Sequence, residues 1–260
     1  MEKGLEKATS KGVPQGGPLS VVCSNVYLDK LDKELEQRGL RFTRYADDVL
    51  IFTKSEMAAN RVMKSISSWI EKKLFLKVNV TKTKVVRPTR SKYLGFTFLK
   101  NVSEWKVRPT NEKKKKLKLK KKLSEYLKRG KAIARPLVVT IKRVNEIVRG
   151  WINYFRIGMM KQFIEEFGEW LRHKIRMIVM KQWKRPKTIY RNLSYLNWKY
   201  KIGCNKEEIF KVANSRLGWY RRCGMNVVNF IISRDLLENR IKNGAGLLNP
   251  LSYYLVKVGI

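Results

Sequence analysis

The sequence predicts an α+β fold, in which an antiparallel sheet with packed helices is followed by an all-α region. Two observations predict it. Before residue 108, strand-forming runs alternate with turn residues, whereas from residue 136 onward apolar residues recur at helical spacing. The stretch between these parts is dominated by lysine. We therefore expect three segments, 1–108, 109–135 and 136–260.

Charge indicates the partner. The 260 residues include 58 Lys and Arg against 21 Asp and Glu, a formal net charge of +37. A compact fold with this imbalance repels itself unless a polyanion neutralises it, so nucleic acid is the expected partner. A membrane surface is the rival for basic chains. The cations, however, spread over the whole sequence and alternate with Trp and Tyr, which favours nucleic acid.

Three cysteines, far apart in sequence, predict reduced thiols rather than a disulfide framework. The single histidine and the cysteine spacing also argue against a zinc site. Because the sequence contains neither a secretion signal nor a membrane-spanning apolar run, we expect a cytoplasmic protein without a membrane partner.

The first recognisable element is a Gly- and Pro-rich loop at residues 12–18, which runs into a helix. Prolines fix such a loop and glycines allow it to approach a ligand. The helix is predicted from about Leu19 to Gln37, with Gly39 as its C-cap. Its expected buried side comprises Leu19, Val22, Cys23, Val26, Leu31 and Leu35. We expect its acids to be solvated or paired with nearby lysines; they are Asp29, Asp32, Glu34 and Glu36.

Two adjacent carboxylates, Asp47 and Asp48, lie between strand-forming runs and predict a β-hairpin with these acids at its tip. Neighbouring acids repel each other, so a cation is the natural compensation. Hard ions such as Mg²⁺ prefer carboxylate oxygens and complete their shell with water and phosphates. Two such ions about 3.5–4 Å apart can promote displacement at phosphorus. An ordinary Asp-containing turn is the alternative.

Further elements follow in order. Ser55 is predicted to cap a helix that runs to about Leu74. Strands are expected at 77–80 and 92–99. In the lysine-rich stretch, Leu117, Leu123 and Leu127 predict a helix with one buried edge. Apolar stripes at 141–152 and 163–179 predict the helices of the last region.

Four motifs together resemble the palm of reverse transcriptases encoded by group II introns. They are Pro14-Gln15-Gly16-Gly17-Pro18, Tyr45-Ala46-Asp47-Asp48, Asn79-Val80-Thr81-Lys82-Thr83 and Tyr93-Leu94-Gly95-Phe96. Residues 149–155, 181–187 and 214–220 resemble the maturase domain of the same proteins. The resemblance implies a partial palm at 1–108, a basic thumb helix region at 109–135, and a helical maturase-like RNA-binding domain at 136–260.

The resemblance also implies a function. It is RNA-directed DNA polymerisation, by nucleotidyl transfer from a dNTP to a DNA primer on an RNA template, together with binding and splicing of intron RNA. The implied catalytic residues are Asp47, Asp48 and Lys82, with Mg²⁺ held by Asp47 and Asp48 and Mn²⁺ as a substitute. Nucleotide binding falls to Gln15, Gly16 and Tyr45, and the primer grip to Tyr93, Leu94, Gly95 and Phe96. The expected RNA contacts are Lys113, Lys114, Lys115, Lys116, Lys120, Lys121, Arg149, Lys181, Lys184, Arg185 and Lys187.

Two alternatives stay open. One is an RNA-binding splicing cofactor that does not polymerise, and the other is a reverse transcriptase of CRISPR-associated or retron type, against which the maturase-like tail argues. In this family the fingers and a further metal-binding aspartate precede the Pro-Gln-Gly loop. We therefore expect an N-terminally truncated fragment, whose activity on its own is an open question.

Overall fold

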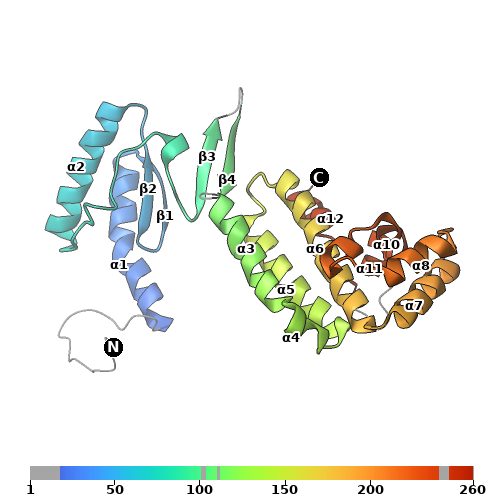
Figure 1. The fold of residues 1–260 in the computed structure, drawn as a ribbon. Coiled ribbons are helices and arrows are strands. Elements are labelled where there is room, and N and C mark those ends of the chain that lie inside the picture. Colours follow the sequence, from blue (N-terminus) through green and yellow to red (C-terminus); the bar gives the residue numbers. More distant parts are fainter. Residues whose placement is uncertain (1–17, 101–103, 110–111, 240–245, 260) are drawn as a thin grey trace. The chain divides into compact units, whose positions relative to one another are not determined.

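The computed structural model describes residues 18–100, 104–109, 112–239 and 246–259. The chain divides into two compact units, the first ending at Leu94 and the second beginning at Gly95. Within the described residues, helices predominate and two separate two-stranded antiparallel sheets occur (Figure 1). The predicted α+β class is confirmed. None of the described helices is long and apolar enough to cross a membrane.

The first unit is a β-hairpin with two helices. Its elements are α1 (Pro18–Gln37), β1 (Arg41–Tyr45), β2 (Asp48–Phe52), α2 (Glu56–Lys73) and a short 3-10 turn, η1 (Pro88–Arg90). Both predicted caps are present. Gly39 has a φ of 62° and the Leu40 N–H reaches back to the Leu35 carbonyl, which closes α1. The Ser55 hydroxyl accepts the Ala58 N–H at the start of α2.

A small core joins the hairpin to the helices. It consists of Leu31 and Leu35 from α1 with Ile66 and Leu74, against which Phe42, Val49 and Ile51 of the hairpin pack. The predicted buried side of α1 is wrong in its first half, because Leu19, Val22 and Val26 are 56–71% exposed. Helical spacing defines an apolar stripe, but the hairpin and α2 cover only the second half of it.

The strand expected at residues 77–80 is also wrong. Asn79 instead organises a turn: its carbonyl accepts the N–H groups of Lys82 and Thr83, and its side-chain oxygen accepts the Lys82 N–H as well. An asparagine side chain that bonds nearby backbone offers the chain an alternative to a strand ladder. Lys82 therefore lies in an exposed turn.

The second unit contains the other hairpin, β3 (Phe96–Lys100) and β4 (Trp105–Pro109), followed by helices. The strand expected from residue 92 begins only at Phe96, because Leu94 and Gly95 have φ values of 46° and 82° and form a turn. The helices are α3 (Glu112–Tyr126), α4 (Arg129–Ile133), α5 (Leu137–Phe155), α6 (Lys161–Trp183), α7 (Pro186–Lys199), α8 (Lys206–Asn214), α9 (Trp219–Cys223), α10 (Asn226–Ile231), α11 (Arg234–Asn239) and α12 (Pro250–Val258).

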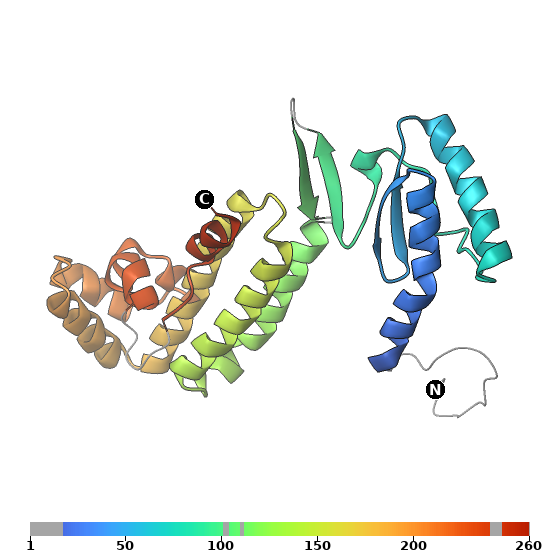
Figure 2. The same ribbon diagram turned by 180° about the vertical axis from the view of Figure 1, so that it is seen from behind.

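Helices α5 and α6 supply much of the core of this unit, and α12 lies beside α6 (Figures 1 and 2). Most residues of the two predicted apolar stripes, 141–152 and 163–179, are buried there, whereas Ile147, Trp151, Trp170 and Val179 are half-buried against the core. Asn145 of α5 donates to the Gly246 carbonyl at 2.8 Å and accepts the Leu248 N–H at 2.9 Å, which fixes the segment before α12.

On α3, the buried edge differs from the prediction by one residue. Leu117 is 64% exposed, whereas Leu119, Leu123 and Leu127 are buried. Leu119 and Leu123 are four residues apart and share a face of α3, which Leu127 continues just past the last helical residue; Leu117 does not lie on this face.

Candidate functional site

The hairpin of the first unit presents two acids to solvent. Tyr45 pairs with Asp48, so Ala46 and Asp47 form the two-residue turn and Asp48 opens β2. Ala46 has a φ of 54°, in the left-handed region. Both aspartates are exposed. The predicted hairpin is therefore present, with Asp47 in the turn and Asp48 one position beyond it.

The two faces of this hairpin differ. Along β1, Phe42 and Arg44 are half-buried, whereas Arg41, Thr43 and Tyr45 are exposed. Strand partners directly opposite each other share a face. Tyr45, which is 65% exposed, and Asp48 therefore lie together on the open face of the hairpin, away from the core.

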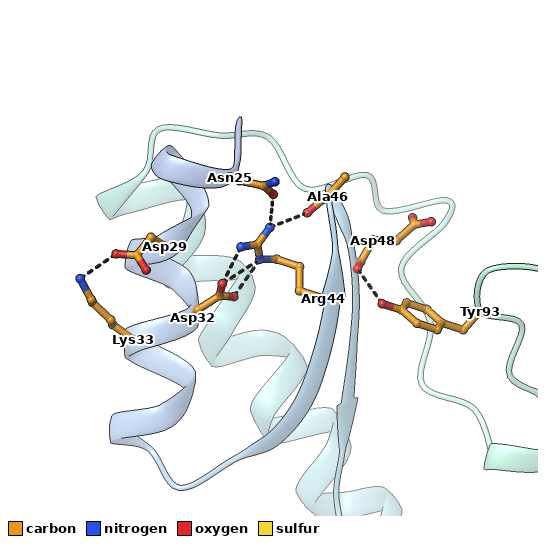
Figure 3. A network of polar contacts seen from close by, with 8 residues as sticks. All are labelled: Asn25, Asp29, Asp32, Lys33, Arg44, Ala46, Asp48 and Tyr93. Atoms are coloured by element: carbon orange, nitrogen blue, oxygen red, sulfur yellow. Dashed lines mark hydrogen bonds and ion pairs between the residues drawn. The ribbon is translucent and has the colours of Figure 1, made fainter. Parts of the chain in front are cut away.

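Asp32 lies beneath the turn and has a partner that the sequence did not reveal. We expected this acid to be solvated or paired with a lysine, but it pairs with Arg44, twelve residues away on β1 (Figure 3). The hydrogen bond to Asp32 raises the pKa of the Arg44 guanidinium. Asp29 does pair with a lysine, Lys33, at 2.6 Å.

The carboxylates of Asp47 and Asp48 are oxygen donors of the kind that hard divalent cations prefer. Among the described residues, no group of three or more His, Cys, Asp or Glu side chains comes together. Asp47 and Asp48 offer two exposed carboxylates. Mg²⁺ is usually bound in this way, by one or two carboxylates with water and substrate phosphates.

Of the other residues implied at this site, Tyr93 has a hydrogen bond to the acidic pair. Its hydroxyl donates to the Asp48 carbonyl at 3.5 Å (Figure 3). Lys82 is exposed in the turn that Asn79 organises. Gln15 and Gly16 lie outside the described residues.

The implied primer grip crosses the boundary between the two units, since Leu94 ends one and Gly95 begins the other. In the second unit, the Lys115 ammonium donates to the Gly95 carbonyl and lies 5.0 Å from the centre of the Phe155 ring. Burial lowers the pKa of Lys115. Phe96 stacks on Tyr154 at 6.0 Å between ring centres. Gly95 and Phe96 are thus anchored to α3 and α5.

Replacing Gly95 with alanine is expected to destabilise the second unit by about 1–2 kcal/mol, because a φ of 82° strains any residue with a Cβ. The new methyl would also lie 2.6 Å from the Lys115 nitrogen and force it away from the Gly95 carbonyl. Urea unfolding measures the effect. Gly130→Ala is the control, since nothing lies within 4 Å of a Cβ there and its φ is not positive. Equal stability of the two variants would contradict the strain argument.

Lysine ammonium groups lie over aromatic rings at several places in the second unit, and we call this set of residues the cation–aromatic stripe. Lys116 lies 4.6 Å from the Phe163 ring centre, and Lys181 lies 4.7 Å from that of Trp219. In addition, Lys120 and Lys174 both lie 5.9 Å from the ring centre of Trp170, and Lys174 is 5.8 Å from that of Tyr220.

Sequence reasoning missed part of this stripe. Lys174 was not predicted, although its position four residues after Trp170 on one helix is a signal that could have found it. Lys181 was predicted as an RNA contact, but the ring that it lies over, Trp219, is far away in sequence and could not be predicted.

The remaining predicted RNA contacts are exposed where the structure describes their side chains: Lys121, Arg149, Lys184, Arg185 and Lys187. The side chains of Lys113 and Lys114 lie outside the described part. A groove of about 530 Å³ between α3 and α5 adds further cations, with Lys118, Lys122 and Arg143 beside Trp151 and Tyr154. Cations in such a groove can contact phosphates, and the aromatic rings beside them can stack on unpaired bases.

Comparison with known families matches both parts of the chain. Residues 2–98 match the family described as reverse transcriptase (RNA-dependent DNA polymerase). Residues 116–196 match the family described as group II intron, maturase-specific domain. Protein YkfC of Escherichia coli (strain K12) is 27% identical to this chain, over 38% of this chain and 34% of that protein. The chain thus spans about a third of the length of this curated relative.

Proposed function

Because the chain belongs to the group II intron reverse transcriptases with a maturase-specific domain, we propose that it is an RNA-directed DNA polymerase that also binds intron RNA for splicing. In the proposed reaction, the 3′ hydroxyl of a DNA primer attacks the α-phosphate of a dNTP on an RNA template and releases pyrophosphate. The observation that carries the proposal is the exposed Asp47–Asp48 turn, within the segment that matches reverse transcriptases.

In this proposal, Asp47 and Asp48 hold a divalent cation, Mg²⁺ with Mn²⁺ as a substitute. The bound ion supplies charge stabilisation at the transferring phosphate. Tyr45 shares the open face of the hairpin with Asp48 and seats the nucleotide together with Gln15 and Gly16. The turn and the two paired strands orient these groups, so the protein promotes the reaction mainly by holding the reacting groups in position.

The primer end is proposed to rest on Tyr93, Leu94, Gly95 and Phe96, and Lys82 to neutralise the leaving pyrophosphate. The bond from Tyr93 to the Asp48 backbone supports this arrangement, since it links the start of the grip to the acidic turn. Residues 1–108 are proposed as a partial palm, 109–135 as a thumb helix region and 136–260 as a maturase-like RNA-binding domain.

The proposed partners are an RNA template, a DNA primer, dNTPs and intron RNA. The cation–aromatic stripe supports contact with RNA, because its lysines can meet phosphates and Tyr220, whose side chain is exposed, can stack on an unpaired base. The same stripe is compatible with a second candidate function, a splicing cofactor that binds intron RNA without polymerising. This function needs RNA contacts but no cation at the turn.

Primer extension separates the two functions. The full chain is incubated with a DNA primer annealed to RNA, dNTPs and either Mg²⁺ or a chelator, and RNA binding is measured alongside. We expect extension that requires both the cation and the RNA template. RNA binding should persist in chelator and fall steeply between about 50 and 200 mM salt. Salt-dependent RNA binding without extension would favour the splicing cofactor and contradict the polymerase.

A further inference from the structure

Arg44 connects the acidic turn to helix α1 through four acceptor atoms. It lies on the core-facing side of β1, and its side chain is only 11% exposed. Its Nε and Nη2 donate to the two carboxylate oxygens of Asp32 at 2.5–3.0 Å. Its Nη1 donates to Asn25 Oδ1 at 2.9 Å and to the Ala46 carbonyl at 3.0 Å (Figure 3).

The bond to the Ala46 carbonyl acts directly on Asp47. That carbonyl and the Asp47 N–H belong to the same peptide unit, which is planar. A hydrogen bond that fixes the Ala46 oxygen therefore also fixes the orientation of the peptide plane that precedes the Asp47 Cα, and with it the direction of the Asp47 side chain. On the other side of the acids, the Asp48 carbonyl accepts from Tyr93. The peptide units on both sides of the acidic pair are thus held by side chains.

The conformation of Ala46 needs such support. Its φ of 54° is left-handed, which is unfavourable for a residue with a Cβ. A conformation of this kind persists only where the surroundings determine it. The guanidinium of Arg44 is one such determinant, because it is itself fixed in two directions by Asp32 and Asn25.

We propose that Arg44 is a positioning residue for the divalent cation, and that with Asp32 it clamps the turn so that Asp47 and Asp48 bind the ion together. The inference rests on the proposed function, since it takes these acids as the metal ligands. Asp32 compensates the charge of Arg44, so the clamp acts through geometry. A lysine keeps the charge but lacks the planar fork that can reach Asp32 and the turn at once.

Mn²⁺ alone is the probe, followed in the full chain by paramagnetic broadening of the NMR amide signals of residues 46–49. We expect Arg44→Lys and Asp32→Asn to raise the Mn²⁺ concentration for half-maximal broadening at least threefold. The matched controls are Arg38→Lys and Glu34→Gln. Arg38 also pairs with an acid of α1, which is Glu34, but its second hydrogen bond goes to Ser65 and not to the turn. These controls do not contact the turn, so they should leave the Mn²⁺ concentration for half-maximal broadening within about 1.5-fold of the parent chain. Asp32→Asn and Glu34→Gln change the net charge equally, so a general charge effect would appear in both.

Two further measurements make the outcomes distinct. The thermal unfolding midpoint is recorded for each variant, and Asp32→Asn carries the test if Arg44→Lys does not fold. Asp47→Asn should abolish the localised broadening. If broadening persists in Asp47→Asn, the metal assignment of the proposed function is overturned, and so is the proposed role of Arg44. If Asp47→Asn abolishes the broadening, but Arg44→Lys and Asp32→Asn respond like their controls, the clamp alone is overturned.

Discussion

Asp47→Asn is expected to lower RNA-templated primer extension by about 10²–10³-fold while leaving RNA binding unchanged. The substitution replaces a charged oxygen with an amide nitrogen, which hard divalent ions do not accept as a ligand. Loss of one group that stabilises charge at the reacting centre typically costs a factor of this size. Asp47 is exposed in a turn, where asparagine is equally at home, so the fold should be unaffected.

The matched control for this experiment is Asp29→Asn. Asp29 is also exposed and the charge change is identical, but its carboxylate pairs with Lys33 on α1. We expect this variant to retain full extension at saturating Mg²⁺. If Asp47→Asn retains more than a tenth of the parent rate, or if the two variants lose activity equally, the acidic turn is not the metal site.

Arg222→Ala is expected to destabilise the second unit by about 2–4 kcal/mol, because Arg222 caps a helix end inside the protein. The side chain is buried, and burial lowers its pKa. Its Nε donates to the Val212 carbonyl at 2.7 Å, its Nη2 donates to the Ala213 carbonyl, and the guanidinium lies 5.0 Å from the Trp219 ring centre. The last carbonyls of a helix have no partner within that helix. Without Arg222 the Ala213 carbonyl loses this bond, and the Val212 carbonyl keeps only the Ser215 N–H, at 3.4 Å. A buried acceptor left unsatisfied costs about 1–3 kcal/mol, and the lost bonds of the charged guanidinium add to this cost.

Arg221→Ala is the control, since it removes the same charge from the neighbouring, exposed position. Urea unfolding followed by circular dichroism measures both variants. The Arg221 variant should stay within about 0.5 kcal/mol of the parent chain. A loss of less than 1 kcal/mol for Arg222→Ala would mean that water reaches the freed carbonyls.

Local structure could be predicted from the sequence wherever a few adjacent residues decide it. Gly39 ends α1 because glycine accepts positive φ, and Ser55 begins α2 because its hydroxyl is one turn away from the N–H it accepts. The acidic hairpin was predictable for the same reason. The strand predicted at Lys77–Val80 was wrong because a strand needs a neighbouring strand to pair with. Here the side chain of Asn79 accepts a nearby backbone N–H instead and favours a turn.

Contacts between distant residues could not be predicted in this way. The exposed first half of α1 has the same helical spacing as its buried second half, so periodicity cannot say which half finds a partner. The ring under Lys181 is Trp219, and the partner of Asp32 is on another element. In each case the sequence gives the chemical type of the side chain, while the fold selects its neighbour.

Asn145 has a consequence for how this chain is made. Its two backbone partners, Gly246 and Leu248, are 101 and 103 residues further along, and they lead into α12, which contacts both α5 and α6. A ribosome adding about 5–20 residues per second delivers them roughly 5–20 s after Asn145. During that interval the nascent chain carries the apolar faces of α5 and α6 without the helix that later covers them.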